Sequence, residues 1–316
     1  MLISIALATY NGEKYIREQL DSILLQSYTN FELIICDDHS TDSTIDIIKS
    51  YLEKDSRISL YQNEINIGFL KNFEKILSFC KGDYIACCDQ DDIWNKNHLE
   101  TLISNIDKND CIGANAELVD EKLISLNKTL SQSMDIYIKP YSDNMLFQRE
   151  CYHNLIQGTA SLFSNNLLQY ILPFPQGIKF HDHWIALNAC IRGGCKYIPE
   201  TILQYRCHSQ NITGYQKFNF FHALQTIKHS AKYRKTIYAH NLAMLQAILP
   251  TTNDIQKKEI VQKAIKFFSN LSKNQHKFAT AFFYIKNYES ITLCPRRKWK
   301  LFFYRVFCIL MFGIMQ

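Results

Sequence analysis

The sequence predicts an α/β protein: a mostly parallel, Rossmann-like sheet flanked by helices, followed by a helical and basic C-terminal region. In the N-terminal part, short apolar runs alternate with amphipathic segments of helical period, a pattern typical of such sheets. The charge also changes sign along the chain, because residues 1–215 hold 18 basic and 27 acidic side chains, whereas residues 216–316 hold 17 and 3. We therefore expect two regions, 1–214 and 215–316, with different partners.

Composition argues against several classes of protein. The chain has 316 residues, of which 47% are hydrophobic and 21% charged, so it does not resemble a disordered protein. Its 11 cysteines are scattered without a C-x-x-C pair, so we expect neither a disulfide framework nor a zinc ribbon, and a reducing cytosol fits. No basic residue precedes the first apolar run, which is therefore expected to be a strand rather than a secretory signal.

The expected strands are the apolar runs 2–9, 32–36, 58–62 and 83–88. Between them, apolar residues recur at helical spacing, as in Ile16, Leu20, Ile23 and Leu24. Ser40 or Thr41 is expected to cap the second helix. Strands this apolar, joined by helices, indicate a parallel sheet that is covered on both faces.

Polar residues follow each expected strand. They are Thr9 to Gly12, Asp37 and Asp38, Asn63 with Asn66 and Gly68, and Asp89 to Asp92. The carboxyl ends of parallel strands meet at one edge, which is where open α/β sheets bind their ligands. For any single position the alternative is a helix cap or a turn, since Asp, Asn and Gly are common in both.

The segment "CCDQDDIW" concentrates negative charge at this edge. Asp89, Asp91 and Asp92 would repel one another and raise their own pKa values unless a divalent cation bound there. Oxygen ligands favour Mg²⁺ or Mn²⁺, and such an ion commonly bridges the phosphates of a nucleotide. The glycine-rich motifs of dehydrogenases and P-loop proteins are absent, which disfavours both classes.

Six motifs occur along the chain in the order "LATYNG", "DDHSTD", "NIGFLKNFE", "GDYIACCDQDDIW", "HDHW" and "YRCHSQN". Together they resemble the inverting family 2 glycosyltransferases, particularly the rhamnosyltransferase-like bacterial enzymes. The resemblance covers residues 2–214. It implies a GT-A fold, a nucleotide-diphosphate sugar donor and a divalent metal.

The resemblance assigns the nucleotide and donor site to Thr9, Tyr10, Asn11, Asp37, Asp38, Asn66, Gly68, Asp89 and Arg206. Thr9 and Tyr10 would form walls of the base pocket, and Asp38, supported by Asp37, would accept the imide N–H of the base. Asp89 would contact the ribose or its neighbourhood. The family commonly has glycine where this chain has His39, so the base preference stays open.

The metal site implied by the resemblance consists of Asp91 as principal ligand, Asp92 beside it, and His208. Asp92 could instead cap the following helix, and His208 could bond the diphosphate. Arg206 would place its guanidinium on phosphate oxygens, with a solvated surface position as the alternative.

The segment "HDHW", residues 181–184, is expected to carry the catalytic base. The resemblance implies that Asp182 takes the proton from an acceptor hydroxyl as that oxygen attacks the anomeric carbon. The alternatives are that Asp182 caps a helix, or that His181 and His183 bind zinc, although no further zinc ligands stand at suitable spacing. The acceptor side is assigned to Gly158, Thr159 and Trp184.

The C-terminal residues are basic and aromatic, which suits an anionic membrane surface. Arg296, Arg297, Lys298 and Lys300 flank Trp299, and the apolar run 306–315 is too short to cross a bilayer. The alternative is a helix that docks on the protein. A nucleic-acid partner is not expected, since no known reading motif accompanies the basic residues.

These expectations describe an inverting, metal-dependent glycosyltransferase. It would move one sugar from a UDP- or dTDP-type donor to a glycan or lipid-linked acceptor in bacterial cell-surface polysaccharide synthesis, working in the cytoplasm on the inner membrane face. The alternatives are a sugar nucleotidyltransferase and a non-catalytic, membrane-associated sugar-nucleotide binding protein.

Overall fold

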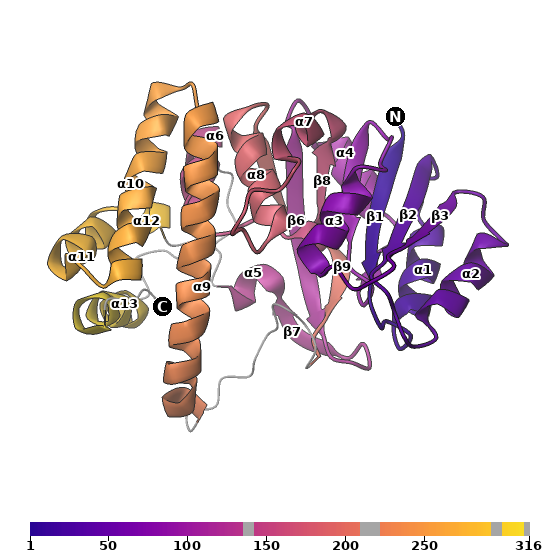
Figure 1. Ribbon diagram of the computed structural model, residues 1–316, viewed down its shortest axis with the longest axis horizontal. Helices are drawn as coiled ribbons and strands as arrows, with labels where there is room; N and C mark the ends of the chain where they lie inside the picture. The colour runs from indigo at the N-terminus through magenta and orange to yellow at the C-terminus, as the bar shows by residue number, and fades with distance from the viewer. Residues whose placement is uncertain (135–141, 209–221, 292–298, 313–316) are drawn as a thin grey trace.

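The first half of the sheet is parallel, as expected. The structure, a computed structural model, describes residues 1–134, 142–208, 222–291 and 299–312. Its four parallel strands are β1 (Ile3–Thr9), β2 (Phe31–Asp37), β3 (Ile58–Gln62) and β4 (Tyr84–Cys88), in the spatial order β3-β2-β1-β4. The helices that connect them are α1 (Ile16–Leu24), α2 (Thr44–Leu52) and α3 (Phe69–Leu77) (Figure 1).

Both faces of the parallel strands are covered, because successive side chains of a strand point to opposite sides of the sheet. Ile5 of β1 belongs to one apolar cluster with Leu20 of α1, whereas its neighbour Ala6 belongs to another with Phe73 of α3. The unbroken apolar runs in the sequence therefore reflect burial on two sides.

The second half of the sheet is mixed. Its strands are β5 (Ile93–Trp94), β6 (Cys111–Val119), β7 (Ser125–Thr129), β8 (Ser161–Ser164) and β9 (Cys195–Arg206). β8 lies between β4 and β6 and is antiparallel to both, while β9 is parallel to β6 and antiparallel to β5. The intervening helices are α4 (His98–Asn105), α5 (Leu130–Ser133), α6 (Asp143–Glu150), η1 (Gly158–Ala160), η2 (Asn165–Leu167), α7 (Leu168–Ile171) and α8 (His181–Ile191).

The helix cap expected at Ser40 or Thr41 is not formed, and neither is the cap considered as the alternative role of Asp92. α2 begins at Thr44 with Ser43 as its N-cap, so neither Ser40 nor Thr41 caps it. The hydroxyl and amide of Ser40 instead bond the carboxylate of Asp37. Asp92 does not cap α4, whose N-cap residue is Asn97. In both places the polar residues after a strand belong to the edge of the sheet rather than to the next helix.

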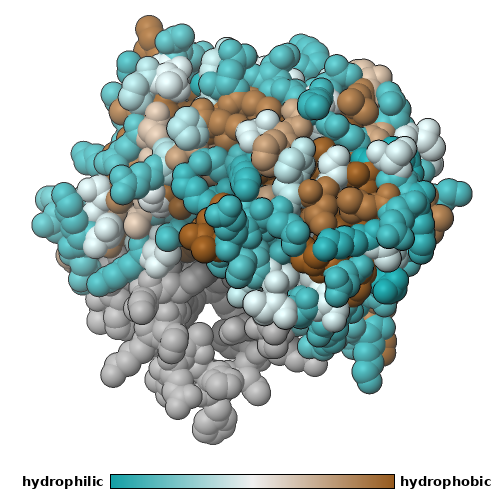
Figure 2. Space-filling model, turned by 45° about the vertical axis from the view of Figure 1, so that its right-hand side comes forward, coloured by the Kyte–Doolittle hydropathy of each residue, from teal (hydrophilic) through white to brown (hydrophobic). Residues whose placement is uncertain are grey.

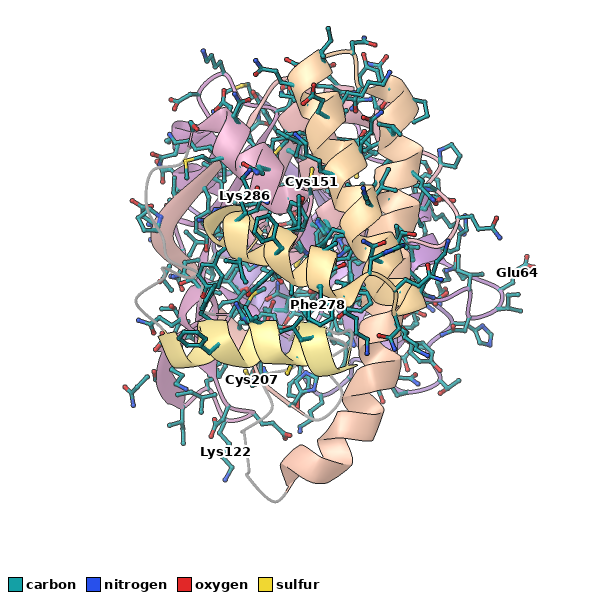
Figure 3. The ribbon with its side chains drawn as sticks, turned by 90° about the vertical axis from the view of Figure 1, so that its left-hand side faces the viewer. Glu64, Lys122, Cys151, Cys207, Phe278 and Lys286 are labelled. Carbon is teal, nitrogen blue, oxygen red and sulfur yellow. The ribbon has the colours of Figure 1, made fainter. Side chains whose placement is uncertain are left out.

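The C-terminal region consists of helices packed against α6 and α8 (Figures 1 and 3). They are α9 (His222–Ile248), η3 (Leu249–Thr251), α10 (Ile255–Lys273), α11 (Lys277–Lys286), α12 (Tyr288–Ile291) and α13 (Trp299–Phe312). Their buried side chains, such as Phe268 and Tyr284, share one apolar cluster with Phe147 of α6 and Trp184 of α8. The two regions are therefore joined by a common core.

The C-terminal apolar run docks on the protein where it is described. Cys308 and Ile309 of α13 are buried, and the ring of Phe302 packs edge-on against Tyr288 at 4.9 Å between centroids. Residues 296–298 lie outside the described part of the chain, as do the side chains of Trp299 and Lys300. No helix within the described residues is long and apolar enough to span a bilayer.

Candidate active site at the carboxyl edge of the sheet

Asp37 and Thr9 fix the turn that follows β2. The buried carboxylate of Asp37 accepts hydrogen bonds from the Thr9 hydroxyl at 2.9 Å and from the backbone N–H of Ser40 at 2.7 Å. The Ser40 hydroxyl and the Asn11 side chain extend this network, since Asn11 donates its backbone N–H to Ser40 Oγ and accepts the N–H of Thr41, both at 2.8 Å. These contacts hold Thr9, Asn11 and Ser40 together at the carboxyl ends of β1 and β2.

Asp38 holds the loop before α3. Its Oδ1 accepts the backbone N–H of Ile67 and the amide of Asn63, and its Oδ2 accepts the N–H of Gly68, each at 2.8 Å. Gly68 has φ +85°, which a side chain would strain. Asn66 donates to the backbone oxygen of Asp38 at 3.2 Å. Because Oδ2 has one donor in the described structure, it retains a lone pair for a ligand N–H.

Gln90 is a structural residue that sequence reasoning missed. Its side-chain amide accepts the backbone N–H of Tyr10 at 2.9 Å and donates to the backbone oxygen of Tyr10 at 3.1 Å. A Cβ on Gly12 would lie 2.3 Å from Gln90 Oε1, so glycine lets the two segments approach. The two hydrogen bonds from Gln90 fix the backbone of Tyr10, while the ring of Tyr10 stays half exposed. The sequence feature that could have pointed to Gln90 is its position between Asp89 and Asp91, two predicted site residues.

The structure brings the three aspartates after β4 together. Burial, followed by the charges of Asp91 and Asp182, raises the pKa of Asp89 to about 7. Burial and the charges of Asp91 and Asp89 raise the pKa of Asp92 well above its ordinary value, against a hydrogen bond from the backbone N–H of Arg206. The Thr159 hydroxyl lies beside Asp92 but outside good hydrogen-bond geometry, since Asp92 Oδ2 has no donor among the described residues. The charged forms of Asp89 and Asp92 are therefore disfavoured unless a cation offsets their charge.

Asp91 and His208 form the part of this cluster that best fits a metal ion. Asp91 Oδ2 lies 2.8 Å from His208 Nε2, and the imidazole stacks on Tyr15 at 5.0 Å between centroids. Two neighbouring ligands of an octahedral ion lie about 3.0 Å apart, so little movement separates this hydrogen bond from coordination. The described residues contain no ready-made group of three or more metal-binding side chains. The donor types and the unsatisfied Asp92 oxygen nevertheless fit a divalent cation.

Arg206 joins the end of β9 to this cluster. Its guanidinium donates to the backbone oxygens of Asp91 at 2.8 Å and Glu121 at 2.9 Å and forms an ion pair with Glu18. It also lies over the ring of Tyr15, and the side chain is buried. These contacts bury the positive charge of Arg206 next to the three aspartates and fix the backbone of Asp91.

Asp182 lies in the first turn of α8, opposite Asp89. Its Oδ2 accepts the backbone N–H of Gly158 at 3.1 Å, and its Oδ1 accepts the N–H of His183 at 2.8 Å. A Cβ on Gly158 would lie 3.0 Å from His181 Nε2, so glycine permits this contact. The charge of Asp182 contributes to the raised pKa of Asp89, so the carboxylates of Asp182 and Asp89 are close enough to interact. Each oxygen keeps acceptor capacity for a substrate hydroxyl.

The other expected acceptor residues differ in position. Thr159 is buried beside Asp92, whereas Trp184 lies in the core with its indole N–H bonded to the backbone oxygen of Ile171 at 3.0 Å. His181 stacks on Phe73 at 3.9 Å between centroids, and burial lowers its pKa. His183 points away from His181 toward α9 and α6, so the two histidines do not share a metal.

A directed hydrogen-bond chain supports Asp182 from the C-terminal region. The backbone N–H of Lys179 donates to His240 Nδ1 at 3.0 Å, so neutral His240 carries its proton on Nε2. That proton is donated to His183 Nδ1 at 3.1 Å, and His183 Nε2 then donates to the backbone oxygen of Glu150 at 2.7 Å. Burial lowers the pKa of His183, and it lowers the pKa of His240 to about 2. The chain fixes the residue next to Asp182.

Replacing His240 is expected to change the pH dependence of stability. The pKa of His240 is about 2 in the folded protein, which is below its value of about 6.5 in the unfolded chain. The contribution of His240 to the free energy of unfolding is therefore fully present above about pH 6.5 and is lost as the pH falls below that value. We expect His240→Phe to reduce this slope by up to about 1.4 kcal/mol per pH unit between about pH 6 and pH 5. Urea unfolding across this range measures it, with His240→Gln as the variant that keeps a donor and an acceptor. Equal slopes in wild type and His240→Phe would show that His240 is not neutral in the fold.

The fold and the site together define an enzyme of nucleotide-sugar chemistry built on a GT-A sheet. The family model "Glycosyl transferase family 2" matches residues 4–171. The chain belongs to this family, and it is a glycosyltransferase.

Curated relatives agree with this assignment. An uncharacterized glycosyltransferase of Haemophilus influenzae is 28% identical over 217 residues, covering 67% of each chain. The UDP-Glc:alpha-D-GlcNAc-diphosphoundecaprenol beta-1,3-glucosyltransferase WfgD of Escherichia coli is 41% identical over 108 residues, which is 34% of this chain and 42% of the relative. The second match therefore covers less than half of the relative's length.

Solved structures share the fold. Staphylococcus aureus TarS 1-349 in complex with UDP-GlcNAc has a TM-score of 0.63 at 20% identity, covering 94% of this chain and 82% of that chain. The mannosyltransferase PcManGT from Pyrobaculum calidifontis, in complex with GDP-Man and Mn²⁺, has a TM-score of 0.57 at 14% identity, covering 99% and 87%. At these identities the likeness supports the α/β architecture, and the helical C-terminal region lies within the matched length.

Proposed function

We propose that the protein is an inverting, metal-dependent glycosyltransferase that moves a single sugar from a UDP- or dTDP-type donor to a hydroxyl group. The observation that carries the proposal is the crowding of Asp89, Asp91 and Asp92 at the carboxyl edge, with Asp182 facing them. A site with that much negative charge suits a cation and the diphosphate it neutralises. The UDP-GlcNAc complex of TarS and the GDP-Man and Mn²⁺ complex of PcManGT support the same ligand classes.

The donor occupies the edge formed by β1, β2 and β4. Tyr10 lines the base pocket, and Asp38 accepts an N–H of the base through the free capacity of Oδ2. Asp91, Asp92 and His208 would hold Mn²⁺ or Mg²⁺, which would supply positive charge to neutralise the departing diphosphate. Arg206 adds a buried positive charge behind Asp91 rather than a direct phosphate contact.

Asp182 acts as the general base. It accepts the proton of the acceptor hydroxyl as that oxygen forms a bond to the anomeric carbon and the bond from that carbon to the diphosphate oxygen breaks. A single displacement from the opposite face inverts the configuration. The N–H groups of Gly158 and His183 orient the carboxylate for this step.

The acceptor is a glycan or a lipid-linked sugar in bacterial surface polysaccharide synthesis. The name of the WfgD relative, a diphosphoundecaprenol-dependent enzyme, supports a lipid-linked acceptor. In this proposal residues 1–214 carry the catalysis at the cytoplasmic face of the inner membrane, and residues 215–316 contribute the membrane contact.

The proposal is tested by thermal shift with nucleoside diphosphates and their sugars. Because a ligand that binds only the folded state raises its melting temperature, UDP or dTDP and their sugars should do so in Mn²⁺ and lose most of the effect in chelator. Nucleoside triphosphates serve as the comparison. Stabilisation by triphosphates alone would favour a sugar nucleotidyltransferase, and no stabilisation by any nucleotide would refute a sugar-nucleotide site.

A further inference from the structure

The helix α11 has two apolar faces, and among the described residues only one of them is buried against the protein. Ala281 and Tyr284 are buried against the rest of the C-terminal region. Phe278 is 84% exposed, Phe282 69% and Ile285 41%, and their spacing places them on one face of the helix. Figure 3 shows this helix with Phe278 and Lys286 toward its two ends.

The neighbouring helix extends this apolar surface. α13 packs beside α11, and its Phe303 is 60% exposed. Phe278, Phe282, Ile285 and Phe303 are here called the α11 face. Large apolar side chains gathered in this way on a soluble protein usually mark an interaction surface. On the side formed by β1 to β3, by comparison, the surface is mostly hydrophilic with apolar side chains in separate patches (Figure 2).

The charge around the α11 face identifies the partner. Between Glu259 and Glu289 the chain has five lysines and no carboxylate. Lys273 and Lys286 are both exposed, one at the end of α10 and the other at the end of α11. Phenylalanine with lysine at its borders suits the headgroup level of a bilayer that contains anionic lipid. A second copy of this chain would instead bring the same lysines together, which costs energy.

Among its described side chains, the tail adds Phe303 to the α11 face and turns its buried apolar side chains toward the protein. In α13 the apolar residues Cys308 and Ile309 are buried against the protein. Part of the apolar run 306–315, which was expected to meet the membrane, therefore packs on the protein itself. The other three residues of the α11 face lie on α11, 10 residues or more before the basic stretch that begins at Arg296.

We propose that the α11 face docks on an anionic lipid bilayer, with Phe278 and Phe282 at the level of the headgroups and Lys273 and Lys286 on lipid phosphates. The inference rests on the proposed function only in its purpose, which is to bring the catalytic edge to a lipid-linked acceptor. Removing two phenylalanine rings from the membrane is expected to weaken binding by at least about tenfold.

The test is sedimentation of the full chain with vesicles of phosphatidylcholine containing about one third phosphatidylglycerol, as an anionic surface. Wild type should bind, and binding should fall with added salt and in vesicles of phosphatidylcholine alone. Phe278→Ser/Phe282→Ser should lose at least about tenfold in partitioning, and Lys273→Glu/Lys286→Glu should also weaken binding. Leu25→Ser/Ile124→Ser is the matched control, since both residues are exposed on the N-terminal region, and it should bind as wild type does.

Three outcomes would overturn the inference: no vesicle binding by wild type, unchanged binding by the phenylalanine variant, or loss of binding by the control as well. Light scattering on the same samples detects the competing occupant, because a dimer dissociated by the phenylalanine change would assign the face to a second copy. Thermal shift with UDP-sugars on the same proteins separates the two proposals. Vesicle binding without a nucleotide response would refute the proposed function and leave the docking surface standing.

Discussion

The variant Asp182→Asn is expected to lose roughly 10²- to 10⁴-fold in kcat while its affinity for the donor stays near that of wild type. Asparagine has nearly the shape of aspartate and keeps one oxygen to accept the N–H of Gly158 or His183, but it cannot take a proton from the acceptor. The loss therefore falls on the chemical step. Steady-state release of nucleoside diphosphate gives kcat, and thermal shift gives donor binding.

A matched carboxylate separates this effect from a general change in charge. Asp107 is exposed in an ion pair with Lys196, and Asp107→Asn should leave turnover unchanged. If Asp182→Asn retained turnover within a factor of about three, the base would have to be another group. A variant that lost donor binding to the same degree as kcat would indicate a structural role instead.

The variant Asp91→Asn is expected to lose on the order of 100-fold or more in turnover and most of the metal dependence of donor binding. Asparagine removes a charge that the cation needs, and it also weakens the contact between position 91 and His208 Nε2. Titration of Mn²⁺ at fixed donor concentration measures the effect. Because the variant has lost most of its metal dependence, chelator should reduce donor binding less in the variant than in wild type.

The neighbouring Gln90 provides the control for Asp91. Gln90→Ala removes the clamp on the backbone of Tyr10 and should weaken donor binding without shifting the Mn²⁺ concentration that gives half-maximal turnover. Equal Mn²⁺ curves for wild type and Asp91→Asn would remove Asp91 from the metal site.

The strands and the acidic edge were predictable from the sequence because both are local signals. The apolar runs report burial on two faces, and the polar residues that follow them report the carboxyl ends of parallel strands. The mixed half of the sheet was not predictable in this way. β8, for example, is four residues long and inserts between β4 and β6, and that placement depends on pairing across long stretches of chain.

One residue that the sequence did not point to, His240, and two whose surroundings differ from the expectation, Arg206 and Trp184, depend on contacts with other parts of the chain. His240 lies 57 positions from His183, and nothing in either segment announces that the two rings are joined. Arg206 was expected at the surface or on phosphate, but it is buried because Glu18 and two backbone oxygens satisfy its donors. Trp184 sits beside Asp182 in the sequence, yet the helical turn directs its ring into the core.

The most direct test of a glycosyl-transfer site is the phosphorus-containing product formed from the best-binding sugar nucleotide. Wild type with Mn²⁺ and a lipid-linked acceptor is followed by phosphorus NMR. We expect nucleoside diphosphate to appear, chelator to stop its release, and no pyrophosphate to form. Pyrophosphate produced from a nucleoside triphosphate and a sugar phosphate would contradict glycosyl transfer, because the acidic edge would then serve nucleotidyl transfer.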